Sequence, residues 1–117
     1  MNLLEAVAKA DELRPNTISG EMKAEWVFLI EGDVARKMKV DCPDNPFPED
    51  TALLLPHQFG PLYYWYLCMM IDLANEDFAM YNADLTVFNG LWDDYVKAAN
   101  TEEYSEKERK RKMWRVM

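Results

Sequence analysis

Apolar residues recur at steps of three or four positions throughout residues 56–100. The positions are Tyr63, Leu67, Met70, Ala74, Phe78, Tyr81, Leu85, Phe88, Trp92, Tyr95 and Ala99. This spacing places them on one face of an α-helix. Because many of them are aromatic, the face is expected to bury a large area per residue. The pattern therefore predicts a long helical region that carries much of the core.

The segment 62–71, which reads LYYWYLCMMI, is apolar on all sides of a helix. A helix without a polar face has to be covered on every side. We expect a chain of 117 residues to supply only part of that cover, and a second chain to supply the rest. The predicted core and subunit-interface residues are Tyr63, Tyr64, Trp65, Tyr66, Met69 and Met70.

Two shorter amphipathic helices are predicted before this region. The first covers residues 3–13 with Asn2 as its N-cap, and the second begins after Ser19 and runs to about Lys39. Gly32 lies in the middle of the second helix, where glycine costs about 1 kcal/mol relative to alanine. We expect this glycine to allow the close approach of another backbone.

Proline and charge mark the remaining segments. Three prolines exclude regular structure from residues 41–50, and residues 51–55 are expected to be extended. Residues 101–117 begin acidic and end basic, and we expect an arm that is mobile alone and helical when bound. The predicted fold is all-α: a small bundle of three to four main helices in residues 1–100, with a Pro-rich loop (41–56) and an extended or flexible C-terminal tail.

The length of the helical region predicts a break within it. A straight helix of about 40 residues spans about 60 Å, whereas a compact domain of this size is about 35–40 Å across. We expect the break between Asn75 and Asp84. The favoured position is residues 81–84, where Asn82 or Asp84 can cap a new helix.

The net charge of -8 is unevenly distributed. Residues 1–101 hold 7 Lys and Arg against 17 Asp and Glu, a net charge of -10, while residues 102–117 hold 6 against 4, a net charge of +2. An acidic body does not bind nucleic acid through its phosphates, because that contact needs Lys and Arg. Three roles stay open for the basic end: contact with nucleic acid or membrane phosphate, docking on a partner protein, and a solvated terminus.

No pattern typical of a catalytic or metal site occurs in the sequence. His57 is the only histidine and lies at a predicted helix start, so a His-based triad is not expected. The acidic groups lack the spacing of a calcium loop and the Glu-x-x-His partners of a carboxylate-bridged metal centre. These groups are Asp41, Asp44, Glu49 and Asp50 in the loop, and Asp72 with Glu76 and Asp93 with Asp94 in the helices. We expect no enzymatic activity, metal or cofactor.

Cysteine usage and hydropathy indicate the compartment. Cys42 and Cys68 do not make a disulfide framework, and Cys68 is expected to be a buried thiol. The ten-residue apolar run is too short to span a bilayer, and the N-terminus lacks the basic region of a signal peptide. We expect a protein made in the cytoplasm, or one that leaves it when the cell lyses.

Several strings in the first hundred residues form a recognisable set. They are Tyr63-Tyr64-Trp65-Tyr66-Leu67, Ile71-Asp72-Leu73-Ala74-Asn75-Glu76, Tyr81-Asn82, Phe88-Asn89, Trp26, Glu31-Gly32 and Leu53-Leu54-Leu55-Pro56. With these strings the chain resembles the small head–tail connector, or adaptor, proteins of long-tailed bacteriophages and prophages. The strings reflect helical packing rather than a catalytic signature, and the basic tail lies outside them.

The resemblance implies a helical bundle that assembles into a ring of about twelve copies beneath the portal vertex. Such a ring extends the channel for double-stranded DNA and offers a platform to stopper or tail-terminator proteins. It implies a location in the virion neck, with no enzymatic activity and no membrane. The candidate portal-docking residues are Arg109, Lys110, Arg111, Lys112, Trp114 and Arg115.

Two other functions fit the sequence. An acidic helical protein can act as a regulatory module that sequesters a basic partner, forming a complex that is sensitive to salt. A stopper or tail-completion protein of the same neck is the other alternative, although such proteins are often richer in β structure.

Overall fold

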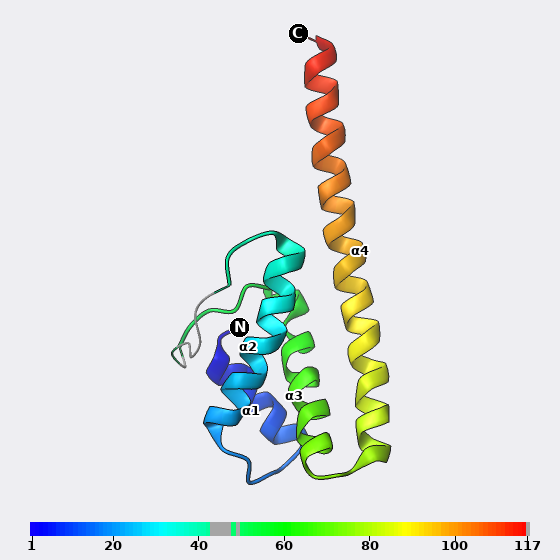
Figure 1. Cartoon of the computed structure of the whole chain (residues 1–117). Helices are drawn as coiled ribbons and strands as arrows, with labels where there is room; N and C mark the ends of the chain where they lie inside the picture. Colours follow the sequence, from blue (N-terminus) through cyan, green and yellow to red (C-terminus); the bar gives the residue numbers. More distant parts are fainter. Residues whose placement is uncertain (43–47, 49, 117) are drawn as a thin grey trace.

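The computed structural model describes residues 1–42, 48 and 50–116, and only the backbone within residues 102–116; the Pro-rich loop is therefore partly outside it. The helices are α1 (Leu3–Leu13), α2 (Gly20–Met38), the 3-10 helix η1 (His57–Phe59), α3 (Pro61–Ala74) and α4 (Phe78–Val116) (Figure 1). The described part of the chain contains no strand, only one bridge between Asn2 and Ala52. The all-α prediction is confirmed.

The helices begin where short polar side chains or proline favour a start. Asn2 Oδ1 accepts the N–H of Glu5 at 2.8 Å, and Ser19 Oγ accepts the N–H of Met22 at 3.2 Å. Each cap satisfies an N–H group that the first helical turn leaves unpaired. Pro61 opens α3, at a position that needs no N–H donor. Both predicted caps are confirmed.

Helix α3 is the central helix of the bundle. It is contacted by α1, α2 and α4, and it lies between α2 and α4 in Figure 1. Its buried residues point in all directions around the helix and are Leu62, Tyr63, Leu67, Cys68, Met69, Ile71 and Asp72. Three helices of the same chain supply most of the cover of this segment, and a contribution from a second chain stays a prediction.

The predicted extended segment 51–55 is fixed to the bundle by a buried hydrogen-bond network. The Tyr63 hydroxyl donates to Glu31 Oε1 at 2.6 Å, and the N–H of Leu54 donates to Glu31 Oε2 at 2.8 Å. The N–H of Leu55 in turn donates to the Tyr63 oxygen at 3.0 Å. One carboxylate from α2 and one hydroxyl from α3 thus satisfy two loop amides that have no partner in a helix or sheet.

The break in the long helical region is made by Glu76 and Asp77. The N–H of Asp77 donates to the carbonyl of Asp72 at 2.9 Å, and that of Glu76 donates to Leu73 at 3.1 Å. These two bonds form a Schellman ending, which requires the left-handed backbone seen at Glu76 (φ 58°). Asp77 also starts α4, because its side chain accepts the N–H of Met80 at 3.2 Å.

The break falls inside the predicted range 75–84, but the favoured position at residues 81–84 is wrong. Asn82 is exposed within α4 and Asp84 is buried within it, so neither begins a helix. The chain turns earlier because Asp77 follows the end of α3 and also caps the start of α4.

Helix α4 is longer than the bundle against which it packs. Its 39 residues correspond to about 58 Å, and the molecule measures 61 × 30 × 18 Å. Lys37 at the end of α2 donates a hydrogen bond to Asn100 at 2.6 Å, and beyond this point α4 continues away from the bundle (Figure 1). The radius of gyration is 16.8 Å, against about 13 Å for a compact chain of this length. The molecule is therefore longer than the compact size expected for its chain length, because α4 continues outside the bundle.

The close approach expected at Gly32 does not occur within the described part of the chain. A methyl group placed on Gly32 would meet no atom within 4 Å. Its neighbours within the chain leave that side of α2 open, so close packing inside the subunit does not explain this glycine.

Candidate functional site

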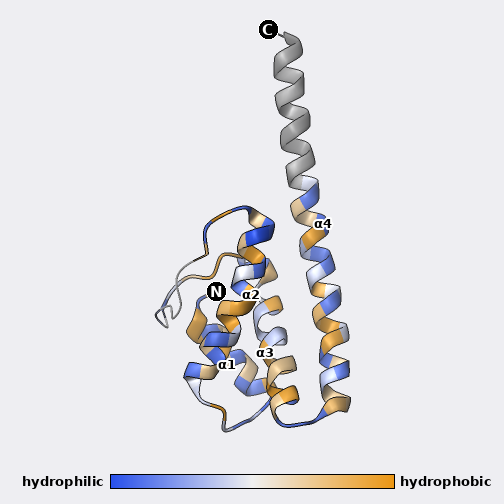
Figure 2. Cartoon of the chain, viewed as in Figure 1, coloured by the Kyte–Doolittle hydropathy of each residue, from blue (hydrophilic) through white to orange (hydrophobic). Residues whose placement is uncertain are grey.

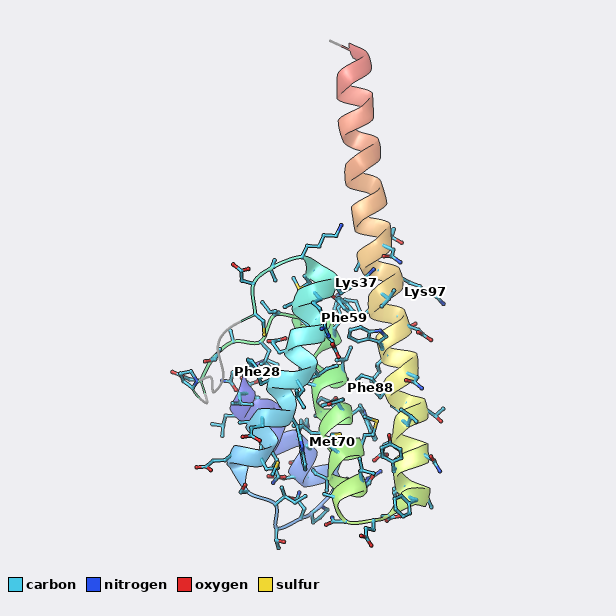
Figure 3. The ribbon with its side chains drawn as sticks, in the orientation of Figure 1. Phe28, Lys37, Phe59, Met70, Phe88 and Lys97 are labelled. Carbon is cyan, nitrogen blue, oxygen red and sulfur yellow. The ribbon has the colours of Figure 1, made fainter. Side chains whose placement is uncertain are left out.

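The six residues predicted for the core and subunit interface fall into two groups. Tyr63 and Met69 are buried in the bundle. The half-buried members are Tyr64, Trp65, Tyr66 and Met70. The Tyr66 ring packs on that of Phe88 of α4, with centroids 5.5 Å apart, and Phe88 lies between the two helices in Figure 3. The half-buried residues thus lie at the edges of α3, and their role at a subunit interface stays a prediction.

Three exposed large apolar side chains lie near the start of α4. Phe78 is 59% exposed, Val87 41% and Met80 37%, and these three residues form what we call the α4 patch. Met80 and Val87 share one flank of α4, while Phe78 occupies the other. Because α4 packs mainly on α3, a single neighbouring helix cannot cover both flanks. Figure 2 shows hydrophobic positions along this part of α4.

A second apolar surface lies on α2. Leu29 is 56% exposed and Met22 44%, and their spacing of seven places them on one side of the helix. We call Met22 and Leu29 the α2 patch. Gly32 lies one turn beyond Leu29, where the backbone is open to the outside. The sequence analysis missed both patches because it assigned the interface to the most hydrophobic segment, which the fold places at the centre.

The predicted portal-docking residues are on the part of α4 that leaves the bundle. Arg109, Lys110, Arg111, Lys112, Trp114 and Arg115 are all within its helical backbone. Their side chains lie outside the described residues, so the docking role stays a prediction. Their backbone belongs to α4, which runs to Val116.

The surface of the bundle is acidic on three of its helices. Exposed carboxylates lie on α1, α2 and α4; examples are Glu5, Glu12, Glu21, Glu25, Asp93 and Asp94. With a net charge of -10 over residues 1–101, this surface repels other polyanions and attracts basic segments.

A buried ionic cluster joins the ends of three helices. Arg14, which follows α1, donates from Nε to Asp72 of α3 at 3.3 Å and from a terminal nitrogen to Asp84 of α4 at 2.7 Å. Asp84 is only 2% exposed and Asp72 is also buried. The guanidinium lies 6.0 Å from the centre of the Trp65 ring, a cation–π distance. The sequence offered a weak signal for this cluster, since Asp72 and Asp84 interrupt otherwise apolar faces.

Burial perturbs the ionisation of both polar networks. It raises the pKa of Asp72 to about 6, helped by the adjacent Asp84 carboxylate and opposed by Arg14. Burial also raises the pKa of Glu31, although hydrogen bonds from Tyr63 and Leu54 act in the other direction. These groups are satisfied mainly by one another and are closed to solvent, so they hold the helices together rather than face a ligand.

The remaining chemical candidates do not combine into a site. His57 is exposed at the start of η1, and burial raises the pKa of the Cys68 thiol to about 12, which keeps it neutral. Among the described residues no group of three or more metal-ligating side chains comes together; Asp44 and Glu49 lie outside them. No helix in the described part of the chain is long and apolar enough to cross a membrane.

Comparison of the chain with protein-family models, with curated proteins and with solved structures finds no significant match. The arguments for function therefore rest on the residues themselves.

Proposed function

We propose that this protein is a structural component of the bacteriophage neck, a head–tail connector that forms a ring of about twelve copies beneath the portal. The ring extends the DNA channel, lets double-stranded DNA pass, and offers a platform for stopper or tail-terminator proteins. The protein is made in the host cytoplasm and ends in the virion, and it works without catalysis, cofactor or membrane.

The projecting end of α4 is the observation that carries this proposal. The helix leaves the bundle after Asn100 and continues to Val116, a further length of about 24 Å. Residues 107–115 hold six basic groups and one acidic group. A helix keeps this charge away from its own acidic body, so the arm is available to another molecule. The portal is the proposed recipient, with the candidate docking residues as the contact.

The two apolar patches support assembly into a ring. The α4 patch and the α2 patch lie on different helices and differ in composition. Contacts between different surfaces of identical subunits are heterologous, and they close into a ring when the rotation between subunits allows it.

The acidic surface fits the proposed conduit. A wall that repels phosphates lets DNA slide without sticking, because nonspecific DNA binding depends on neutralising phosphates with Lys and Arg. The all-α fold favours an adaptor over the stopper alternative. The acidic exposed residues also suit a regulatory module with a basic partner, which the experiment below distinguishes.

The test combines the full-length chain with the portal protein of the same phage, examined by electron microscopy and light scattering. We expect rings of fixed copy number stacked on the portal. The double variant Phe78→Gln and Val87→Gln is expected to stay folded but to lose ring formation, whereas Asn89→Gln, a substitution at an exposed polar site of the same helix, keeps it.

Monomers without affinity for the portal at any salt concentration would contradict the connector. A one-to-one or two-to-two complex with a basic host protein, whose association slows steeply with salt, would favour the regulatory module instead.

A further inference from the structure

One arginine and two aspartates connect α1, α3 and α4 at the end of the bundle where α3 turns into α4. Asp72 lies in the last turn of α3, Asp84 in the second turn of α4, and Arg14 directly follows α1. Arg14 contacts both carboxylates, at 3.3 Å and 2.7 Å. The relative position of three helices therefore depends on one small cluster.

While both aspartates are ionised, one carboxylate oxygen of this cluster has no hydrogen-bond donor within the described part of the chain. Asp84 Oδ2 is buried and has no hydrogen-bond partner among the described residues. A buried acceptor without a donor costs free energy, and so does a net negative charge. A proton on Asp72 removes both costs. The protonated carboxyl can donate a hydrogen bond to Asp84, which lies within hydrogen-bonding reach. The cluster then carries one positive and one negative charge, so its net charge is zero.

The neighbouring charged groups do not supply a second cation. Among the described residues, Arg14 is the only cation that forms an ion pair with Asp72. Asp11 of α1 is engaged by Lys23 of α2 at 2.7 Å, so that lysine is already neutralised. Cys68 of α3 faces the cluster as a neutral thiol. The proton is thus the one charge that can balance the second carboxylate.

We propose that a proton on Asp72, whose hydroxyl donates to the Asp84 carboxylate, is a latch that fastens α4 to the ends of α1 and α3, and that its loss lets the first turns of α4 open. The proposal concerns the single chain and goes beyond the proposed role in the phage neck. It defines a pH-controlled step at the base of the helix that carries the α4 patch and the projecting arm.

The sign of the effect follows from the ionisation of Asp72. Burial first, then hydrogen bonding to Asp84 and repulsion from it, raise its pKa from 3.8 to about 6 in the folded chain. A group whose pKa is higher in the closed state stabilises that state when protonated, and the stabilisation is lost as the pH rises from about 4 through 6. The latch is closed in mild acid and weakened at neutral pH.

Hydrogen exchange on the full-length chain tests the latch. The backbone amides of residues 78–85 report opening of the first turns of α4, after correction for the intrinsic exchange rate at each pH. With pKa values of about 6 closed and 3.8 open, we expect the opening constant to be about tenfold larger at about pH 7.5 than at about pH 5. Equal opening at the two pH values would overturn the proposal.

Two variants isolate the proton. In Asp72→Asn the amide donates to Asp84 at every pH, so the pH dependence of opening is expected to disappear. In Asp93→Asn, which removes an exposed carboxylate from the same helix, the tenfold dependence is expected to remain. A pH dependence that persists in Asp72→Asn, or that is lost in Asp93→Asn, contradicts the latch.

A measurement on the unmodified chain keeps the proposal testable if a variant does not fold. The carboxyl carbon of Asp72, followed by NMR through a pH titration, is expected to change with a midpoint near 6. A midpoint near the ordinary aspartate value of about 4 would rule the latch out. Neither measurement involves the portal, so failure of the latch is distinguishable from failure of the proposed function.

Discussion

Two residues with side chains, rather than glycines, end helices of this bundle in the left-handed conformation. Lys39 ends α2 with φ 60° and Glu76 ends α3 with φ 58°. Both endings have the two Schellman hydrogen bonds, which at α2 join Val40 to Ala35 and Lys39 to Arg36. A side chain in this conformation costs about 1–2 kcal/mol, a cost that glycine does not carry.

Replacing Glu76 by glycine is therefore expected to stabilise the fold by about 0.5–1 kcal/mol, since the relief of strain exceeds the added chain entropy of glycine. Urea unfolding followed by circular dichroism measures the change. Asn75→Gly is the matched control, because Asn75 has an ordinary backbone (φ -88°) and gains nothing from glycine. Equal effects of the two substitutions would show that the left-handed backbone carries no strain.

The sequence predicts local polar roles and misses those that depend on distant partners. Asn2 and Ser19 were predicted as caps because each acts on an amide three residues ahead. Asp84 was taken as a possible cap, but its partner Arg14 is 70 residues away. Asp77 was missed as the start of α4 because its capping role depends on the chain turning at Glu76, and neither glycine nor proline marks that turn.

At the scale of the elements, periodicity predicted which faces are apolar but not what covers them. The all-round apolar segment 62–71 was correctly placed in a helix, and its covering by α1, α2 and α4 is a property of the topology. The apolar face of α4 was also predicted. Only the fold shows that this face is wider than the area that α3 alone can cover. Exposed apolar side chains also lie at the start of α4 and on α2, while the interface role of the half-buried residues of α3 stays a prediction.

Gly32 allows the element-scale argument to be tested. Its surroundings have room for a methyl group, so Gly32→Ala is expected to stabilise the isolated chain by about 1 kcal/mol through helix propensity. Gly90→Ala in α4, where the space is also open, is expected to give a similar gain and serves as control. Thermal unfolding at matched concentration measures both. A loss of stability confined to Gly32→Ala would mean that another backbone approaches this site after all.

At the scale of the whole molecule, the protein is a compact bundle with a helical arm, two parts of opposite charge. The first hundred residues contain the hydrophobic core, whose members range from Leu3 to Tyr95. The change of composition after residue 100 predicted a charged arm separate from the bundle, and that division stays a prediction.

Removing the arm is expected to separate folding from assembly. A chain ending at Thr101 keeps the hydrogen bond between Lys37 and Asn100 and every residue that the structure describes as buried, so its unfolding free energy is expected to stay within about 0.5 kcal/mol of that of the full chain. Its net charge becomes -10, and the basic contact proposed for the portal is lost. Urea unfolding and portal binding, measured side by side, check the two halves of this expectation.

A full-length variant with all six portal-docking candidates replaced by glutamine controls for the loss of helix length. Unchanged portal binding by both chains would move the docking site to the bundle, whereas a large loss of stability on truncation would show that the arm supports the fold.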